Sequence, residues 1–179
     1  MRILVIAAVD FELDAARKVW EGESVCFLRG GVGAEATRKV LEDALDSGGF
    51  DRVLDIGIAG SYRPDLLPGA VVHVTAERHA DGAGEWLLNP SPWPELDFLP
   101  VAKGNTLQML DDRFRVSPAD IESMEGAAVF EVCLRRGIPF AEIRSISNAV
   151  GERDHANWDI PAALSALESA LNTLKTRLL

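Results

Sequence analysis

Residues 2–20, RILVIAAVDFELDAARKVW, decide the fold class of this 179-residue chain. Arg2 to Val9 is apolar after its first residue and has the length of a strand, which is typical of strands buried on both faces of a sheet. Asp10 to Trp20 then carries its apolar residues at helical spacing, with Asp10 as the expected N-cap. A strand that feeds directly into a helix indicates an α/β domain.

The rest of the chain continues this alternation. Further strands are expected at residues 24–28, 53–59, 70–75, 99–102, near 121 and at 139–147. Further helices are expected at residues 34–45, 124–136 and 160–179. Residues 81–94 are rich in Gly, Pro and Asn, which predicts a surface loop. We expect a single domain over residues 1–179, a three-layer α/β/α fold with a mixed, largely parallel twisted sheet and helices on both faces.

Composition narrows the functional classes. The chain has 18 basic and 28 acidic side chains, a formal charge of −10, and 47% hydrophobic residues. This charge disfavours nucleic acids and anionic membranes as partners, because both are bound through Lys and Arg. The longest apolar run is far below the ~20 residues of a membrane span. Cys26 and Cys133 have no neighbours at metal-ligand spacing, so we expect reduced thiols, no metal and a cytoplasmic protein.

Ligands of α/β sheets bind at the carboxyl ends of the strands. The candidate residues at those ends are Glu12, Ala59, Gly60 and Asn148. Glu125 joins them from the start of a helix whose positions 128, 129 and 132 are apolar, so its carboxylate is expected to face inward. A favourable interaction with a helix dipole is the alternative explanation for either carboxylate alone, but it leaves a charge on the core face unexplained.

Residues 31–36, GVGAEA, follow an expected strand and precede a helix, as the dinucleotide-binding fingerprint does. Asp51 and Asp55 lie at about the right distance downstream for the acidic residue that binds a ribose. Residues 56–59 continue the strand beyond Asp55, however, and the chain leaves little room for a catalytic half. A structural glycine turn is the simpler interpretation, and a nucleoside- or dinucleotide-binding module without catalysis is an alternative function.

Five blocks, in this order along the chain, resemble the nucleoside phosphorylase/hydrolase superfamily. They are residues 5–12 (VIAAVDFE), 31–33 (GVG), 56–60 (IGIAG), 122–128 (ESMEGAA) and 143–148 (IRSISN). Within the superfamily the chain is most similar to the futalosine hydrolase family of the menaquinone pathway, through the last two blocks and the ERD tripeptide and Trp158 that follow. The resemblance is thin between residues 82 and 120, where segments look shorter than the family norm.

The resemblance implies a cofactor-free, homodimeric enzyme that acts on a small purine nucleoside. Breaking an N-ribosidic bond passes through an oxocarbenium-like ribose, so the site needs a group that positions water, an anion near the sugar and a donor to the purine. By similarity, Glu12 deprotonates the water, Glu125 binds the ribose hydroxyls and Met124 packs against the sugar. Leu107 and Gln108 are expected to face the purine.

Asn148 stands where adenosine-type nucleosidases of the superfamily carry Asp. A protonated Asp can give its proton to purine N7, which an adenine leaving group needs, whereas an amide offers an N–H donor and a C=O acceptor suited to a 6-oxopurine. The expected reaction is therefore hydrolysis of futalosine with release of hypoxanthine. A turn residue at a strand end is the alternative explanation of Asn148, and a methylthioadenosine/adenosylhomocysteine-type nucleosidase is the alternative enzyme.

Water is the expected nucleophile. Phosphorolytic relatives carry phosphate-clamping arginines, one of them just before the glycine stretch of the third strand, and residues 54–56 (LDI) include no cation. Arg29 beside Gly30 is the exception that keeps phosphorolysis open. Futalosine also bears a carboxylate at its non-purine end, and our hypothesis is that Arg153 or Arg63, in loops beyond strand ends, binds it.

Overall fold

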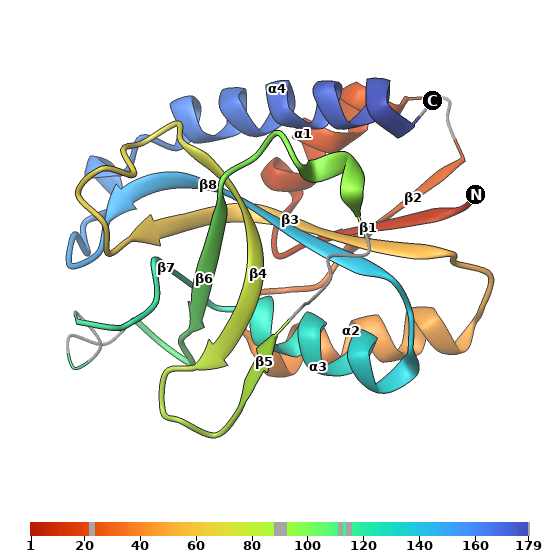
Figure 1. Cartoon of the computed structure of the whole chain (residues 1–179), viewed down its shortest axis with the longest axis horizontal. Helices are drawn as coiled ribbons and strands as arrows, with labels where there is room; N and C mark the ends of the chain where they lie inside the picture. Colours follow the sequence, from red (N-terminus) through yellow and green to blue (C-terminus); the bar gives the residue numbers. More distant parts are fainter. Residues whose placement is uncertain (22–23, 88–92, 111–112, 114–115, 179) are drawn as a thin grey trace.

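The computed structural model describes residues 1–21, 24–87, 93–110, 113 and 116–178, which form three layers (Figure 1). Helices α1 (Asp10–Trp20) and α4 (Ile160–Leu178) cover one face of the sheet, and α2 (Ala34–Asp46) and α3 (Gly126–Arg136) cover the other. The short 3₁₀ helices η1 (Pro94–Leu96) and η3 (His155–Asn157) lie in connections. The expected α/β/α architecture is confirmed.

In the described part of the chain, one sheet of eight strands forms the middle layer. The strands are β1 (Ile3–Ala7), β2 (Val25–Arg29), β3 (Arg52–Ser61), β4 (Val71–His79), β5 (Glu85–Leu87), β6 (Val101–Thr106), β7 (Ile121–Ser123) and β8 (Phe140–Ala149). β1 pairs in parallel with β2 and β3, and β3 pairs in parallel with β8. The pairings run on from β8 through β4, β6 and β7 back to β3, so this half of the sheet closes on itself.

Successive residues of β1 enter two different hydrophobic cores. Val5 belongs to the core under α1 and α4, together with Leu13 and Leu171. Ile6 belongs to the core over α2 and α3, which contains Phe130. Because side chains alternate between the two faces of a strand, a central strand covered on both faces must be apolar at every position. This burial explains the continuous apolar run from which the fold class was predicted.

The boundary of α1 differs from the prediction in one functional detail. Its N-cap is Val9 rather than Asp10. The Glu12 carboxylate reaches back to accept a hydrogen bond from the Val9 N–H (3.3 Å), as the third helical residue of a capping box does. The start of the first helix is thus capped by a side chain that also belongs to the candidate site.

The segment predicted as a surface loop over residues 81–94 contains strand β5, so that prediction is wrong at residues 85–87. β5 pairs antiparallel with residues 76–78 of β4. Trp86 packs against the second core and makes an edge contact with His79, with ring centroids 5.4 Å apart. The Gly and Pro content of the segment predicted a loop, so the sequence did not reveal this strand or the packing of Trp86. Residues 88–92 of the segment, and residue 179 of the expected final helix, lie outside the described residues.

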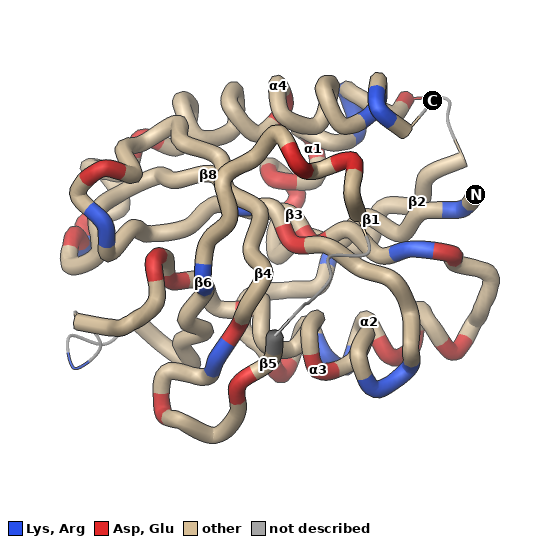
Figure 2. Tube along the Cα trace, viewed as in Figure 1, with Lys and Arg blue, Asp and Glu red and all other residues tan. Residues whose placement is uncertain are grey.

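No helix in the described part of the chain combines the length and the apolar character that a membrane crossing requires. Acidic positions are spread along the whole trace and are not gathered on one face (Figure 2). The net charge of −10 is therefore largely a property of the solvated surface, apart from the few carboxyl groups that the fold buries.

Candidate active site

A pocket of about 310 Å³ opens at the carboxyl-terminal parts of β1, β3 and β8. Seven of the nine site residues proposed from the sequence line it: Glu12, Ala59, Gly60, Leu107, Met124, Glu125 and Asn148. A larger hollow of about 580 Å³ lies over α1 and α4, where Lys18 and Glu168 form an ion pair across it. The described residues that line the larger hollow form no cluster of buried polar side chains, so the pocket at the strand ends is the candidate active site.

Glu12 is held in this pocket by two backbone groups. Its Oε1 accepts a hydrogen bond from the Ile58 N–H (2.9 Å), and its Oε2 accepts one from the Val9 N–H (3.3 Å). Burial raises the pKa of Glu12 above its ordinary value, although the Ile58 N–H and the Arg144 guanidinium oppose the shift. A carboxylate with a raised pKa is a better proton acceptor near neutral pH, and two fixed donors define its orientation.

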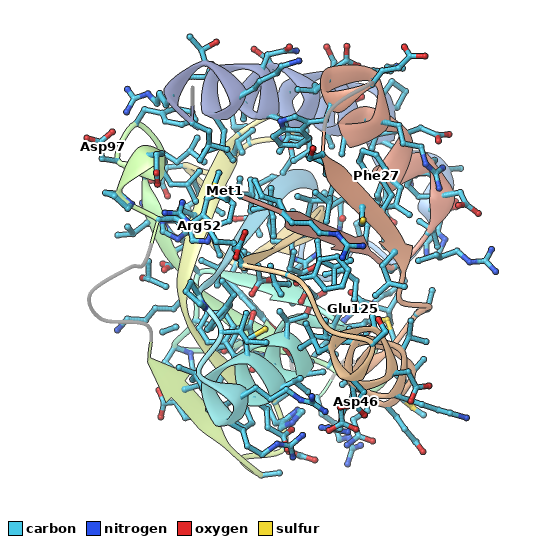
Figure 3. The ribbon with its side chains drawn as sticks, turned by 90° about the vertical axis from the view of Figure 1, so that its right-hand side faces the viewer. Met1, Phe27, Asp46, Arg52, Asp97 and Glu125 are labelled. Carbon is cyan, nitrogen blue, oxygen red and sulfur yellow. The ribbon has the colours of Figure 1, made fainter. Side chains whose placement is uncertain are left out.

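Glu125 occupies the N-cap position of α3 and is 8% exposed. Its Oε1 accepts a hydrogen bond from the Gly33 N–H (3.0 Å), and its Oε2 accepts one from the Met124 N–H (3.2 Å). In Figure 3, Glu125 lies inside the fold beside α2, whereas Asp46 at the far end of α2 points outward. The carboxylate therefore faces inward, as the apolar stripe of α3 predicted.

The glycine turn over residues 31–33 serves Glu125 rather than a pyrophosphate. Gly31 and Gly33 have φ angles of 84° and 96°, which residues with a side chain rarely adopt, and this turn directs the Gly33 N–H at the carboxylate. Asp55 lies inside β3 and is 1% exposed, so it does not end a strand at a ribose site. Asp51 accepts a hydrogen bond from the Arg2 N–H (2.6 Å). The dinucleotide alternative therefore finds no support in this geometry.

Asn148 and Glu122 flank Gly60 on neighbouring strands. Gly60 is in register with Asn148 on β8 and with Glu122 on β7. A Cβ at Gly60 would lie 3.2 Å from Asn148 Nδ2 and 3.3 Å from Glu122 Oε1, so the glycine leaves room for both side chains. Asn148 Oδ1 accepts a hydrogen bond from Ser147 Oγ (2.7 Å), and its Nδ2 donates to the Ala149 carbonyl (2.9 Å). One N–H of the amide remains for a ligand, because an amide nitrogen carries two.

Two residues proposed from the sequence do not line the pocket. Gln108 is exposed, whereas its neighbour Leu107 is buried and does line it. Arg153 donates to Glu122 Oε1 (3.0 Å). The expected contacts of Gln108 with the purine and of Arg153 with the substrate carboxylate stay predictions, and the described pocket lining includes neither side chain.

The other two arginines considered from the sequence lie in ion pairs at the surface. Arg63 donates to Asp65 (2.5 Å), and Arg29 donates to Asp10 (3.1 Å). Neither arginine lines the pocket. The cations that the sequence suggested for a substrate carboxylate or a phosphate are thus already paired with carboxylates of the chain.

The sequence pointed to neither Glu122 nor His155 as a site residue, yet both line the pocket. Glu122 is 4% exposed and accepts hydrogen bonds from Tyr62 Oη (3.0 Å) and Arg153 Nη1 (3.0 Å). It lies in the three-residue strand β7, where the antiparallel pairing with β3 decides its position. His155 lies in η3 beside Trp158. Its only sequence signal was its place just after the block that ends at Asn148.

A buried arginine supports the floor of the pocket. Arg144 of β8 donates to Glu142 Oε1 (2.7 Å) and to Asp55 Oδ2 (2.5 Å). A Cβ at Gly57 would lie 2.2 Å from Arg144 Nη1 and 3.0 Å from Glu12 Oε1. Only a glycine at position 57 lets the guanidinium and the Glu12 carboxylate approach the same point of β3.

Glu77 adds a further carboxyl group to this buried layer. Glu77 Oε2 accepts a hydrogen bond from Thr106 Oγ1 (2.8 Å). Glu77 Oε1 and Glu142 Oε2 have no hydrogen-bond partner in the described part of the chain, and a Cβ at Gly126 would meet them at 2.5 and 2.8 Å. Burial raises the pKa of Glu77 well above its usual value, and the negative charge of Glu142 adds to the shift. The arrangement favours a protonated Glu77 beside the Glu142 carboxylate.

Among the described residues, no group of three His, Cys, Asp or Glu side chains could hold a metal ion. Cys26 and Cys133 are free thiols. The polar side chains in the described lining of the pocket are carboxylates, an amide, two serine hydroxyls and one imidazole.

Residues 100–178 match the family model described as Phosphorylase superfamily. This match covers the β6–β8 half of the site, including Glu122, Glu125 and Asn148. The resemblance to that superfamily, predicted from the sequence, is confirmed.

Curated proteins similar to this chain include futalosine hydrolases and 5′-methylthioadenosine/S-adenosylhomocysteine nucleosidases. The chain is 29% identical to the futalosine hydrolase of Streptomyces coelicolor, over 97% of this chain and 95% of that protein. It is 24% identical to the 5′-methylthioadenosine/S-adenosylhomocysteine nucleosidase of Tolumonas auensis, over 95% and 86% of the two chains. Both names denote N-glycosyl hydrolases, so the predicted enzyme class is confirmed.

Two solved structures from Helicobacter pylori share the fold. The 5′-methylthioadenosine/S-adenosylhomocysteine nucleosidase superposes with a TM-score of 0.87 at 16% identity, over 99% of this chain and 97% of that one. A futalosine hydrolase mutant superposes with a TM-score of 0.86 at 15% identity, over 99% and 98%. Since one fold carries both enzyme names, the substrate must be argued from side chains.

The chain is shorter than its relatives, as the sequence suggested. The alignment with the Streptomyces coelicolor protein spans 223 positions, so at least 44 of them have no counterpart in the 179 residues of this chain. Whether the missing positions fall between residues 82 and 120 stays a prediction, as do the homodimer and the cytoplasmic location.

The protonated state of Glu77 predicts how stability depends on pH. The folded protein keeps a proton that the unfolded chain loses above its usual pKa of 4.5, so the stabilisation from this group is complete below that value and is lost as the pH rises towards the raised pKa. Glu77→Gln mimics the protonated carboxyl. We expect its free energy of unfolding to fall less steeply between pH 5 and pH 8 than that of the wild type, measured by urea denaturation.

The control for this prediction is Glu85→Gln, an exposed carboxylate on the adjoining strand β5. Its pH dependence should follow the wild type. Equal slopes in Glu77→Gln and wild type would show that Glu77 is ionised in the folded protein.

Proposed function

We propose that this protein hydrolyses the N-ribosidic bond of futalosine and releases hypoxanthine. The observation that carries the proposal is the convergence of Glu12, Glu125 and Asn148 in one pocket. These residues come from three segments far apart in the sequence, and each is fixed by hydrogen bonds to its surroundings. A site of preorganised carboxylates and an amide supplies what a cationic sugar and a departing purine require.

We assign to Glu12 the role of the general base that deprotonates the attacking water. Its raised pKa suits a general base, and its two backbone donors leave further acceptor positions on the carboxylate for a water molecule. We assign Glu125 to the ribose, where its negative charge stabilises the developing oxocarbenium ion and accepts hydrogen bonds from hydroxyl groups. Met124 lines the pocket beside Glu125 and supplies an apolar surface for the sugar.

The lining of the pocket supports water rather than phosphate as the nucleophile. No Lys or Arg occurs among its described lining residues, whereas three carboxylates do, Glu12, Glu122 and Glu125. A phosphate anion would be repelled by these charges and would find no clamp. Arg29, the cation that kept phosphorolysis open, is 65% exposed and paired with Asp10 at the surface.

The hydrogen bonds of the Asn148 amide support hypoxanthine as the leaving group. Its amide has a remaining N–H that can donate to purine N7, but it carries no acidic proton to transfer. Hypoxanthine leaves more readily than adenine without N7 protonation, so an amide at this position fits a 6-oxopurine nucleoside.

A methylthioadenosine-type nucleosidase is the second candidate. Relatives and solved structures of that name share the fold, and the apolar side chains of Phe11, Trp158 and Ile160 line the pocket. An apolar wall accepts a methylthio group as readily as a larger substituent. The two candidates differ in the base released and can be separated directly.

The decisive assay measures the free base released from futalosine, aminodeoxyfutalosine, methylthioadenosine and inosine, each with and without phosphate. We expect hypoxanthine from futalosine at the highest kcat/KM, with no phosphate requirement. Adenine release at an equal or higher rate would favour the second candidate. Phosphate-dependent turnover, or no base from any nucleoside, would contradict hydrolysis.

Replacement of the carboxylates tests their roles. Glu12→Gln and Glu125→Gln should each lower kcat by ~10²-fold or more, because one removes the base and the other removes charge stabilisation. The wild-type kcat/KM should fall towards acid pH along a limb set by Glu12, above the usual pKa of 4.5 because the pKa of Glu12 is raised. Glu35→Gln, an exposed carboxylate of α2, is the matched control. Wild-type rates in either site variant would remove that residue from the mechanism.

Asn148→Asp tests the leaving group. An Asp can arrive protonated and donate to purine N7, so the ratio of adenine to hypoxanthine release should rise by about 10-fold or more. The measurement compares methylthioadenosine and futalosine in the wild type, Asn148→Asp and Asn148→Ala. An equal ratio in all three proteins would contradict the assignment of Asn148 to the purine.

A further inference from the structure

The charges of the pocket are unevenly distributed. Glu12, Glu122 and Glu125 line it, and the only basic side chain among its described lining residues is His155. A ligand anion placed beside the three carboxylates would be repelled by each of them. His155 is therefore the place in this pocket where a negatively charged part of a ligand can be held.

His155 belongs to a separate wall of the pocket. It lies in η3, between β8 and α4, and Trp158 and Ile160 line the pocket from the same connection. Phe11 of α1 lines it as well, and α1 lies beside α4 on one face of the sheet (Figure 1). Glu125 comes from the β7–α3 connection on the other face. If ribose lies at Glu125, the wall of apolar side chains is left for the substituent beyond the sugar.

The imidazole of His155 is positioned by its contact with Trp158 and is accessible to a ligand. Its ring centroid lies 4.2 Å from that of Trp158, with the planes inclined by 40°, and the residue is exposed. Neither ring nitrogen has a hydrogen-bond partner among the described residues. The acidic neighbours are engaged locally, because Asp154 accepts from the Ala156 N–H (2.9 Å) and Glu152 accepts from the Asp154 N–H (2.8 Å).

We propose that His155, resting on Trp158, binds a carboxylate at the end of the 5′ substituent of the nucleoside. An imidazole N–H donates a hydrogen bond to the carboxylate, and the apolar wall accepts the group that joins the carboxylate to the sugar. This inference rests on the proposed function. It assigns the side chain that distinguishes futalosine, which ends in a carboxylate, from methylthioadenosine, which ends in an uncharged methylthio group.

The test compares futalosine with its neutral methyl ester in four proteins. These are the wild type, His155→Gln, His155→Arg and Lys39→Gln, the last removing one exposed positive charge from α2 as a matched control. We expect the ratio of kcat/KM for the acid over the ester to fall about 10-fold in His155→Gln, mainly through KM, since one hydrogen bond to an ionised carboxylate is weakened or lost. His155→Arg should keep most of the ratio, and Lys39→Gln all of it.

Two results would overturn the inference while leaving hydrolysis of futalosine intact. One is an unchanged ratio in His155→Gln. The other is an equal loss for acid and ester, because a structural or purely stacking role affects both substrates alike. If the wild-type protein releases no hypoxanthine from futalosine, the proposed function fails first, and the carboxylate assignment fails with it.

Discussion

The balance of charge around Arg144 is the constraint on which the site depends. The guanidinium is buried and pairs with Asp55 and Glu142, and it opposes the rise in the pKa of Glu12. Removing one partner of a buried ion pair is costly because it leaves an uncompensated charge. Because Gly57 has no side chain, the Arg144 guanidinium can lie directly against β3. The structure below the pocket therefore depends on both this glycine and the buried arginine.

The carboxylates above this floor are oriented by backbone groups. Glu12 binds the N–H groups of Val9 and Ile58, and Glu125 binds that of Gly33, so each carboxylate joins two segments of the chain. Backbone donors in strands, turns and helix ends move little, and a site built on them needs little reorganisation during a reaction. The same hydrogen bonds therefore connect segments of the fold and orient the carboxylates of the site.

The sequence predicted those parts of the site that follow from local pattern. Parallel strands bring their carboxyl ends together, so the positions of Glu12, Gly60 and Asn148 follow from where the strands end. Glu122 stands in one of the blocks that resemble the superfamily, but its place in the pocket was not predicted, because it follows from the antiparallel pairing of β7 with β3. The pairing of Arg153 with Glu122 could not be predicted, because no sequence pattern shows which carboxylate an arginine in a loop will bind.

By itself, the sequence determined the alternation of strands and helices, the burial of β1 on both faces and the placement of polar residues at strand ends. These are local properties, set by apolar periodicity and by the residues that begin and end helices. The tertiary structure alone decided which groups meet: the Gly33 N–H with Glu125, Arg144 with Asp55, and the pair of His155 and Trp158 with the other residues of the pocket. Most such partners lie far apart along the chain, and strand register and layer packing bring them within bonding distance.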